Sequence, residues 1–292
     1  MKLKSIITKY SIAFGISAIA IIIACQPDEF EGNGNGILSP KLDSTFTITP
    51  VIVEGKTNTY VFNVNDMTNV LGVKWDLGQG LVSTSERTDT IFYPLKGVYN
   101  LTLKLTGIGG RIFSTTQQLL IEKSDPNAIN ILQGPEFNTG DEAYWTQLNI
   151  TPGVTFSFAD GKTVVSGGNG GHAALYQPVN VTEGKKYKLD MTVSGKGAVD
   201  TWFEVYLGYD APVQGKDYGS GGNLMGLNTW SKCGDTPFNT KLSSIACSGN
   251  IKGNALISIT KTGTAYLVIK CGGKDLGEGG ISIDDVELRL IP

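Results

Sequence analysis

The chain has very little histidine and no Cys-x-x-Cys pair, and both absences limit the chemistry open to it. His172 is its single histidine. Zinc sites draw their ligands from clustered cysteine and histidine, and a Ser-His-Asp triad needs a histidine between its partners. The sequence therefore gives no support for a zinc enzyme and little for a serine hydrolase.

An excess of basic residues is also missing. There are 24 Lys and Arg against 27 Asp and Glu, and the formal net charge is −3. Proteins that bind nucleic acids carry a basic patch or stripe that neutralises phosphates. We expect no nucleic-acid partner, and a ligand that is neutral or cationic.

The first residues have the pattern of an export signal. Three lysines precede an apolar run from Ile12 to Ala24, which is shorter than the ~20 residues of a membrane-spanning helix. The run ends in IIAC, which resembles a bacterial lipobox and implies that residues 1–24 are a lipoprotein signal peptide and that Cys25 carries the lipid. A plain signal peptide or an anchor helix with a chance cysteine is the alternative.

The residues that follow Cys25 refine the expected location. Removing residues 1–24 takes away three lysines and no acid, which lowers the formal charge from −3 to −6. The stretch QPDE (26–29) resembles the acidic signal that sends Bacteroidetes lipoproteins to the cell surface. The resemblance implies a lipid-anchored protein on the outer face of the outer membrane.

Three cysteines remain after Cys25, and they cannot all pair with one another. Cys233 and Cys247 bracket the loop GDTPFNTKLSSIA, of the kind that a disulfide staples. Cys271 ends the apolar run AYLVIKC and is expected to be a lone thiol at a strand end.

No window shows sustained helical periodicity, whereas short alternating or apolar runs recur along the chain. They include TYVFNV, GVYNLTLKL, QQLLIE, KKYKLDMTV, FEVYL, ALISIT, AYLVIK and ISIDDVELRL. We predict an all-β protein. Gly/Asn-rich and Asp-Pro breaks divide it into a flexible tether (25–39), a first domain (40–123) and a second domain (127–292).

The first domain resembles the PKD family. VKWDLGQG (73–80) matches the family's WDFGDG motif, and GVYNLTLKL follows as the later strand. The departure is Gln79, where the family often has Asp. The resemblance implies an Ig-like sandwich that serves as a spacer, with Trp75 in its core.

The second domain resembles carbohydrate-binding modules of the family-4-like group. It opens with NILQGPEFNTGDEAYW and closes with GISIDDVEL, and HAALYQPVNVTEGKKYKL matches an internal strand pair of that family. The resemblance implies a β-jelly-roll sandwich that offers one sheet face to ligand. It also implies a structural role for Trp145.

The stretch TWFEVYLGY (201–209) predicts that ligand face. As a strand it places Trp202, Glu204 and Tyr206 opposite the core stripe. Flat aromatics can stack on the apolar faces of a sugar ring, and a carboxylate can accept hydrogen bonds from its hydroxyls. The alternatives are that a loop covers this face or that the register is slipped by one residue.

Further candidates come from neighbouring segments. Asn228 and Trp230 precede Cys233, so a disulfide would brace the loop that holds them. His172 and Tyr176 share a strand face, and Tyr209 and Tyr218 flank the loop DAPVQGKD. Each has a structural alternative: Trp230 as a hydrophobic plug, His172 as a hydrogen-bonding residue, and the tyrosines as core cover.

Two stretches of the second domain resemble ligand-binding motifs. GGNGG (167–171) lacks the Lys-Ser/Thr of a phosphate-binding loop, so we expect a tight turn. Family-4-like modules often hold a structural Ca²⁺, for which Glu136 and Asp284 would be ligands. Asn138 stands where the family has an acid, so calcium is left open, and no cofactor is required.

These observations favour a non-catalytic, surface-anchored binder of polysaccharide. The layout resembles proteins that bind laminarin or mixed-linkage β-glucan beside a TonB-dependent transporter and surface glycoside hydrolases. The alternatives are a cell-surface adhesin or scaffold, and a glycoside hydrolase. The hydrolase is disfavoured because only Glu204 lies on the expected face and Asp200 is ~13 Å along the strand.

Overall fold

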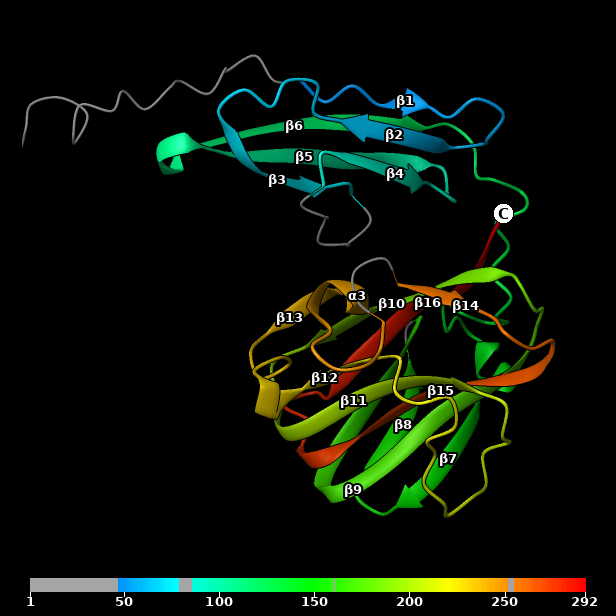
Figure 1. Cartoon of the computed structure of the whole chain (residues 1–292). Helices are drawn as coiled ribbons and strands as arrows, with labels where there is room; N and C mark the ends of the chain where they lie inside the picture. The colour runs from blue at the N-terminus through cyan, green and yellow to red at the C-terminus, as the bar shows by residue number, and fades with distance from the viewer. Residues whose placement is uncertain (1–46, 79–85, 160, 252–254) are drawn as a thin grey trace, which may run out of the picture.

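The computed structural model describes residues 47–78, 86–159, 161–251 and 255–292 (Figure 1). The predicted signal peptide, the whole predicted tether (25–39) with Cys25, the start of the predicted first domain (40–46), and Gln79 and Gly80 of the PKD-like motif lie outside these residues. The all-β prediction is confirmed: each strand-like run expected from the sequence contributes to a strand. In the described part of the chain, no helix has both the length and the apolar character needed to cross a membrane.

The N-terminal part forms two three-stranded sheets, ordered β1-β2-β4 and β3-β5-β6. Between them lies a core in which Leu101, Leu103 and Leu105 alternate with exposed or half-buried residues of β5. Trp75 is buried in this core, as its motif predicted. The elements are β1 (Val51–Ile52), β2 (Thr59–Asn63), β3 (Val70–Asp76), β4 (Thr88–Phe92), β5 (Gly97–Gly107), the 3-10 turn η1 (Ile108–Gly110) and β6 (Ile112–Ile121).

The C-terminal part has its own, larger core, and its described residues form ten strands and three short helical turns. The strands are β7 (Thr146–Thr151), β8 (Val154–Ala159), β9 (Lys162–Val181), β10 (Lys186–Gly195), β11 (Val199–Gly208), β12 (Met225–Asn228), β13 (Phe238–Lys241), β14 (Leu256–Ser258), β15 (Gly263–Asp275) and β16 (Ile281–Ile291). The turns are η2 (Asp141–Tyr144), η3 (Thr229–Ser231) and α3 (Leu242–Ile245).

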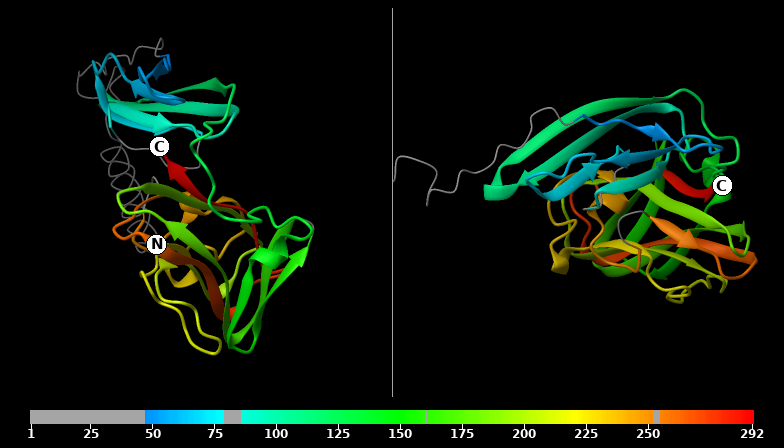
Figure 2. Two further views of the ribbon diagram at one scale, coloured as in Figure 1. Left: turned by 90° about the vertical axis from the view of Figure 1, so that its right-hand side faces the viewer. Right: turned by 45° about the horizontal axis from the view of Figure 1, so that its top comes forward.

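The long strand β9 joins the two layers of this curled sandwich (Figures 1 and 2). Its first residues pair with β8 and β16, and from Gly168 onward it pairs with β15, then with β7. A Cβ at Gly168 would lie 2.1 Å from the Lys274 carbonyl oxygen. The expectation of a tight turn at GGNGG was therefore wrong: these residues bend a continuous strand. Neighbouring backbones leave no room for a Cβ at Gly167, Gly168 and Gly171, and Asn169 and Gly170 have positive φ where the ladder is irregular.

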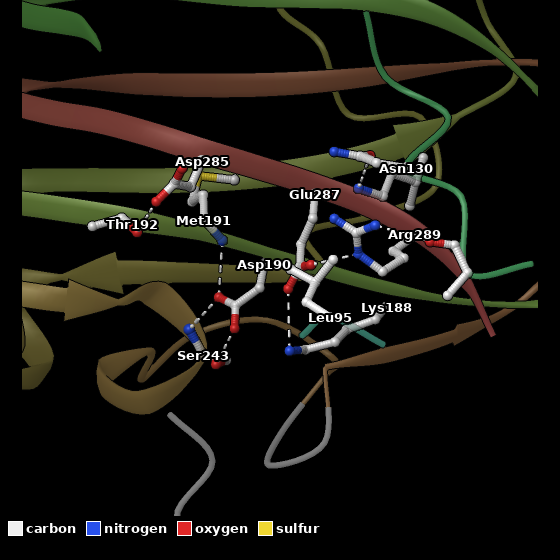
Figure 3. Close-up of polar contacts among 12 residues, drawn as sticks. Leu95, Asn130, Lys188, Asp190, Met191, Thr192, Ser243, Asp285, Glu287 and Arg289 are labelled. Atoms are coloured by element: carbon white, nitrogen blue, oxygen red, sulfur yellow. Dashed lines mark hydrogen bonds and ion pairs between the residues drawn. The ribbon is translucent and has the colours of Figure 1, made fainter. Parts of the chain in front are cut away.

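Three charged side chains of β10 and β16, Lys188, Glu287 and Arg289, form a paired network (Figure 3). Glu287 accepts from the Arg289 guanidinium at 3.0 Å and lies 3.1 Å from the Lys188 ammonium. Arg289 also donates to the carbonyl of Ala128, in the segment that leads into the sandwich. Although burial opposes ionisation, these two cations lower the pKa of Glu287. The network fixes the incoming chain to the last strand.

Candidate functional site

Strand β11 has two faces of different character. Thr201, Phe203 and Val205 are buried, and the last two lie in the main core. Trp202 and Glu204 point to the opposite, outer face, where both are half-buried. A register slipped by one residue would have exchanged these two sets. The outer face of the layer formed by β7, β9, β15, β11 and β12 is therefore the candidate site.

Five residues in direct ladder register cross this outer face. We call them the tryptophan row, from one edge of the layer to the other: Thr151, His172, Gly272, Trp202 and Asn228. The two rings of the row meet edge to face with centroids 5.8 Å apart, His172 from β9 and Trp202 from β11. The row brings together three of the predicted site residues.

Gly272 makes the approach of those two rings possible. A Cβ at this position would lie 2.4 Å from the Cβ of His172 and 2.8 Å from Cζ2 of Trp202. We expect Gly272→Ala to lower the free energy of unfolding by about 2 kcal/mol, since its methyl group must displace packed neighbours. Urea denaturation measures this loss.

The matched control is Gly219→Ala. Nothing lies within 4 Å of a Cβ built there, so it should leave stability almost unchanged. Equal stability of the two variants would contradict the tight packing of the row.

A segment that we call the strap, residues 209–224, leaves β11 and crosses the outer face before β12 begins. It reaches β7 at the far edge, where Gly215 donates its amide hydrogen to the Asn149 carbonyl at 2.9 Å. The Gln214 side chain donates to the carbonyl of Gln147 and accepts from the amide of Asn149. The strap therefore covers part of the face that the sequence predicted to be open.

Tyr206 lies beneath the strap and is 5% exposed. The ring of Tyr218 packs on it edge to face, with centroids 5.9 Å apart, inside a small apolar cluster completed by Leu148, Ala174 and Val268. The expectation of an open Tyr206 ring was wrong, because the loop that directly follows β11 covers it, as the alternative in the sequence analysis had it. Its hydroxyl donates to Glu204, and burial followed by this bond raises the pKa of Tyr206.

The remaining predicted tyrosines lie apart from the row. Tyr176 is half-buried against Tyr266, at 6.2 Å between centroids. Tyr209 packs against the main core and donates its hydroxyl hydrogen to the carbonyl of Lys261. In this arrangement both act as cover for apolar clusters.

Lys270, like Asp217, is a residue of the site that the sequence analysis missed. It is 4% exposed on β15, and its ammonium lies 2.9 Å from Asp217 Oδ1, 2.8 Å from the Tyr218 carbonyl and 3.6 Å from Glu204 Oε2. The signal in the sequence was a lysine inside the apolar run AYLVIKC, since a buried cation needs partners.

Asp217 is brought to the row by the strap. Its Oδ1 atom also lies 3.7 Å from Nε2 of His172. Partial burial alone would raise the pKa of Asp217, but the hydrogen bond and charge of Lys270 outweigh it and lower that pKa. The other ring nitrogen of His172, Nδ1, is within 2.8 Å of the Thr151 hydroxyl. His172 therefore lies on the candidate face, and it also makes the structural hydrogen bonds that the sequence analysis gave as its alternative role.

A second, more exposed aromatic follows the end of the row. Trp230 lies in η3 and is 60% exposed, and its amide donates to the Asn228 side chain at 3.0 Å. Cys233 and Cys247 form a disulfide close behind it, with Cα atoms 6.2 Å apart. Asn228 therefore uses one amide oxygen to shape the turn that presents Trp230.

The two calcium candidates are engaged with local protein groups. Glu136 accepts from the Asn138 side chain at 3.0 Å, and Asp284 accepts from the amide of Asp285. Burial first, and then the like charges of Asp285 and Glu136, raise the pKa of Asp284. Among the described residues, no three His, Cys, Asp or Glu side chains gather as metal ligands would. The calcium site at Glu136 and Asp284 stays a prediction.

Comparisons with known proteins give weak structural likeness only. No family model and no curated protein matches the chain. One aligned structure is from a study of the promiscuous specificity of carbohydrate-binding modules of the β-sandwich superfamily, at 17% identity over 84% of this chain and 97% of that one, with a TM-score of 0.33.

Two further alignments cover about half of this chain. A family 61 carbohydrate-binding module in complex with β-1,4-galactotriose has 15% identity over 55% of this chain and 98% of its own, with a TM-score of 0.29. A family 4 module has 14% identity over 50% and 86%, with a TM-score of 0.28. Such scores do not decide a function, which has to be argued from the site.

Proposed function

We propose that the C-terminal sandwich binds a polysaccharide without cleaving it, and that the tryptophan row is where the sugar lies. The observation that carries this proposal is the half-buried Trp202, an indole on the outer face that packs against His172 and the Lys270 ammonium. Indole rings suit the apolar faces of a pyranose. Glu204, Asp217 and His172 surround it with groups that can bond sugar hydroxyls.

Catalysis is disfavoured for a reason that differs from the sequence argument. The strap adds a second carboxylate to the face, and Asp217 and Glu204 lie 2.9 and 3.6 Å from one ammonium. A glycoside hydrolase needs one carboxyl with a raised pKa as its general acid. The hydrogen bond and charge of Lys270 instead lower the pKa of Asp217.

The proposal extends to which glycan is bound and to where the protein is anchored. With Lys270 neutralised by two carboxylates, the charge that remains near the row is acidic, which favours a neutral polymer such as a β-glucan, laminarin or mixed-linkage glucan. Acyl chains on Cys25 would hold the protein in the outer membrane, with the N-terminal part as a spacer. Captured chains would pass to surface glycoside hydrolases and a TonB-dependent transporter.

Calorimetric titration of residues 25–292, with Cys25→Ser to prevent acylation, tests the proposal against a glycan panel. We expect a dissociation constant in the micromolar range or weaker for at least one neutral glycan, no heat with a polyuronate, and no release of reducing ends. The absence of binding heat with every neutral glycan of the panel would overturn the proposal and favour a protein-binding scaffold. Release of reducing ends would make the protein a hydrolase.

A further inference from the structure

We propose that Lys270 is a positioning residue, which holds both the strap and the Trp202 ring in the arrangement that binds glycan. This inference deepens the function proposed above and rests on it. It assigns the affinity of the site in part to a side chain that would not itself touch the sugar.

The first argument is the burial of the cation. The Lys270 side chain is 5% exposed and comes from the middle layer of strands, between β11 and β9. A buried ammonium is strongly destabilising unless it is paired and hydrogen-bonded. Here Asp217, the Tyr218 carbonyl and Glu204 surround the nitrogen at 2.9, 2.8 and 3.6 Å, and these contacts offset the desolvation cost.

The second argument is that two of those partners belong to the strap. Asp217 and the carbonyl of Tyr218 bind the ammonium at 2.9 and 2.8 Å, although they are more than 50 residues away in sequence. Asp217 is itself 65% exposed at its side chain, so it is the outer end of the contact. Lys270 therefore holds Asp217 and Tyr218 of the strap against the sheet, while Gln214 and Gly215 of the strap hydrogen-bond to β7.

The third argument concerns the aromatic rings. The ammonium lies 5.1 Å from the ring centroid of Trp202 and 4.8 Å from that of Tyr206. A cation over an aromatic face is attracted by the ring, and the attraction grows when water is excluded. His172 also packs against Trp202, with the two centroids 5.8 Å apart. Lys270 and His172 together leave the indole little freedom to rotate.

An indole that is already fixed loses less conformational freedom when a sugar stacks on it. Without Lys270, the strap could lift and the ring could rotate, and the exposed surface would be chemically similar but no longer preorganised. The expected loss is therefore in affinity, with the outer-face residues still present.

The experiment compares Lys270→Met with Lys274→Met in residues 25–292, Cys25→Ser. Lys274 lies on the same strand, and its side chain is 72% exposed beside Asp200, which makes it the matched control. Asp217→Asn weakens the same contact from the strap side at an exposed position, so it remains informative if Lys270→Met does not fold.

Two measurements need no ligand. Tryptic cleavage at Lys216, an exposed strap residue, should become about tenfold faster in Lys270→Met and several-fold faster in Asp217→Asn, and should not change in Lys274→Met. With 5-fluorotryptophan incorporated, the resonance assigned by its loss in Trp202→Phe should shift in Lys270→Met, while the Trp75 and Trp145 resonances stay in place. General destabilisation would instead affect the core tryptophans.

The third measurement is glycan affinity by calorimetry, which we expect to fall about tenfold in Lys270→Met and not in Lys274→Met. Unchanged affinity together with a released strap would overturn the positioning role. Unchanged cleavage and an unshifted Trp202 resonance would also overturn it. If the wild-type chain binds no glycan, the proposed function fails, and the two ligand-free measurements still decide whether Lys270 holds the strap and the ring.

Discussion

Replacing Trp202 with alanine is expected to weaken glycan binding by about 30-fold or more, because aromatic anchors at the centre of a binding surface commonly contribute 2 kcal/mol or more. The substitution removes the indole of the row, which is half-buried and held in place by its contacts with His172 and Lys270. Glu204 and Asp217 would remain, but without a surface against which a pyranose can stack.

Calorimetric titration and retention in an affinity gel measure this loss. Trp230→Ala serves as a comparison. The Trp230 ring is 60% exposed, and a ring that is not held by neighbours loses more conformational freedom on binding. We therefore expect the affinity for glycan to fall only a few-fold in this variant. Tyr144→Ala, an exposed aromatic in η2, should have no effect.

Thermal melting has to accompany these titrations, since Trp202 is half-buried and its removal will also cost some stability. A folded Trp202→Ala variant that retains wild-type affinity would show that the sugar does not lie on the row. The proposed function would then need another face of the sandwich.

The strands of the sandwich were predictable because their burial follows a period of two. In β11 and β5, the alternation of apolar and polar residues is already visible in the sequence. The predicted outer orientation of Trp202 and Glu204 follows from the same period. The pairing of Cys233 with Cys247 was accessible because both flank one short loop.

The strap could not be predicted, because its position depends on contacts between residues that are distant in sequence. Nothing in DAPVQGKDY indicates that Asp217 will meet Lys270, or that Tyr218 will cover Tyr206. The two errors at this site, an open Tyr206 and a single carboxylate on the face, have this common origin. The GGNGG error is different: glycines that permit a turn equally permit a bend within a strand, and only the crowded neighbouring backbones decide between them.

Removal of the Cys233–Cys247 disulfide, by replacing both residues with serine, is expected to lower the free energy of unfolding by about 3 kcal/mol. The bond joins residues 14 apart in sequence, and a closed loop of this size restricts the unfolded chain by roughly that amount. For a sandwich of this size, the loss corresponds to a decrease in melting temperature of roughly 6 to 12 °C.

The bond also has a local consequence for the site. The amide of Cys233 donates to the Asn228 carbonyl and the amide of Cys247 to that of Gly226, so the bonded pair fixes both ends of the loop to β12. Asn228 is the last residue of the tryptophan row and shapes the turn that carries Trp230. We therefore expect the serine variant to bind glycan a few-fold more weakly under conditions in which it is fully folded.

Denaturation of the wild type with and without a reductant should reproduce the stability difference, because the third cysteine of the sandwich does not interfere. Cys271 is unpaired and buried in the core, and burial raises the pKa of its thiol, which keeps it unreactive. The reductant should consequently have no effect on the double-serine variant and its full effect on Cys271→Ser. Equal stability of the reduced and oxidised wild type would mean that the loop is held by its backbone bonds to β12 alone, and that the bond contributes nothing to the presentation of Trp230.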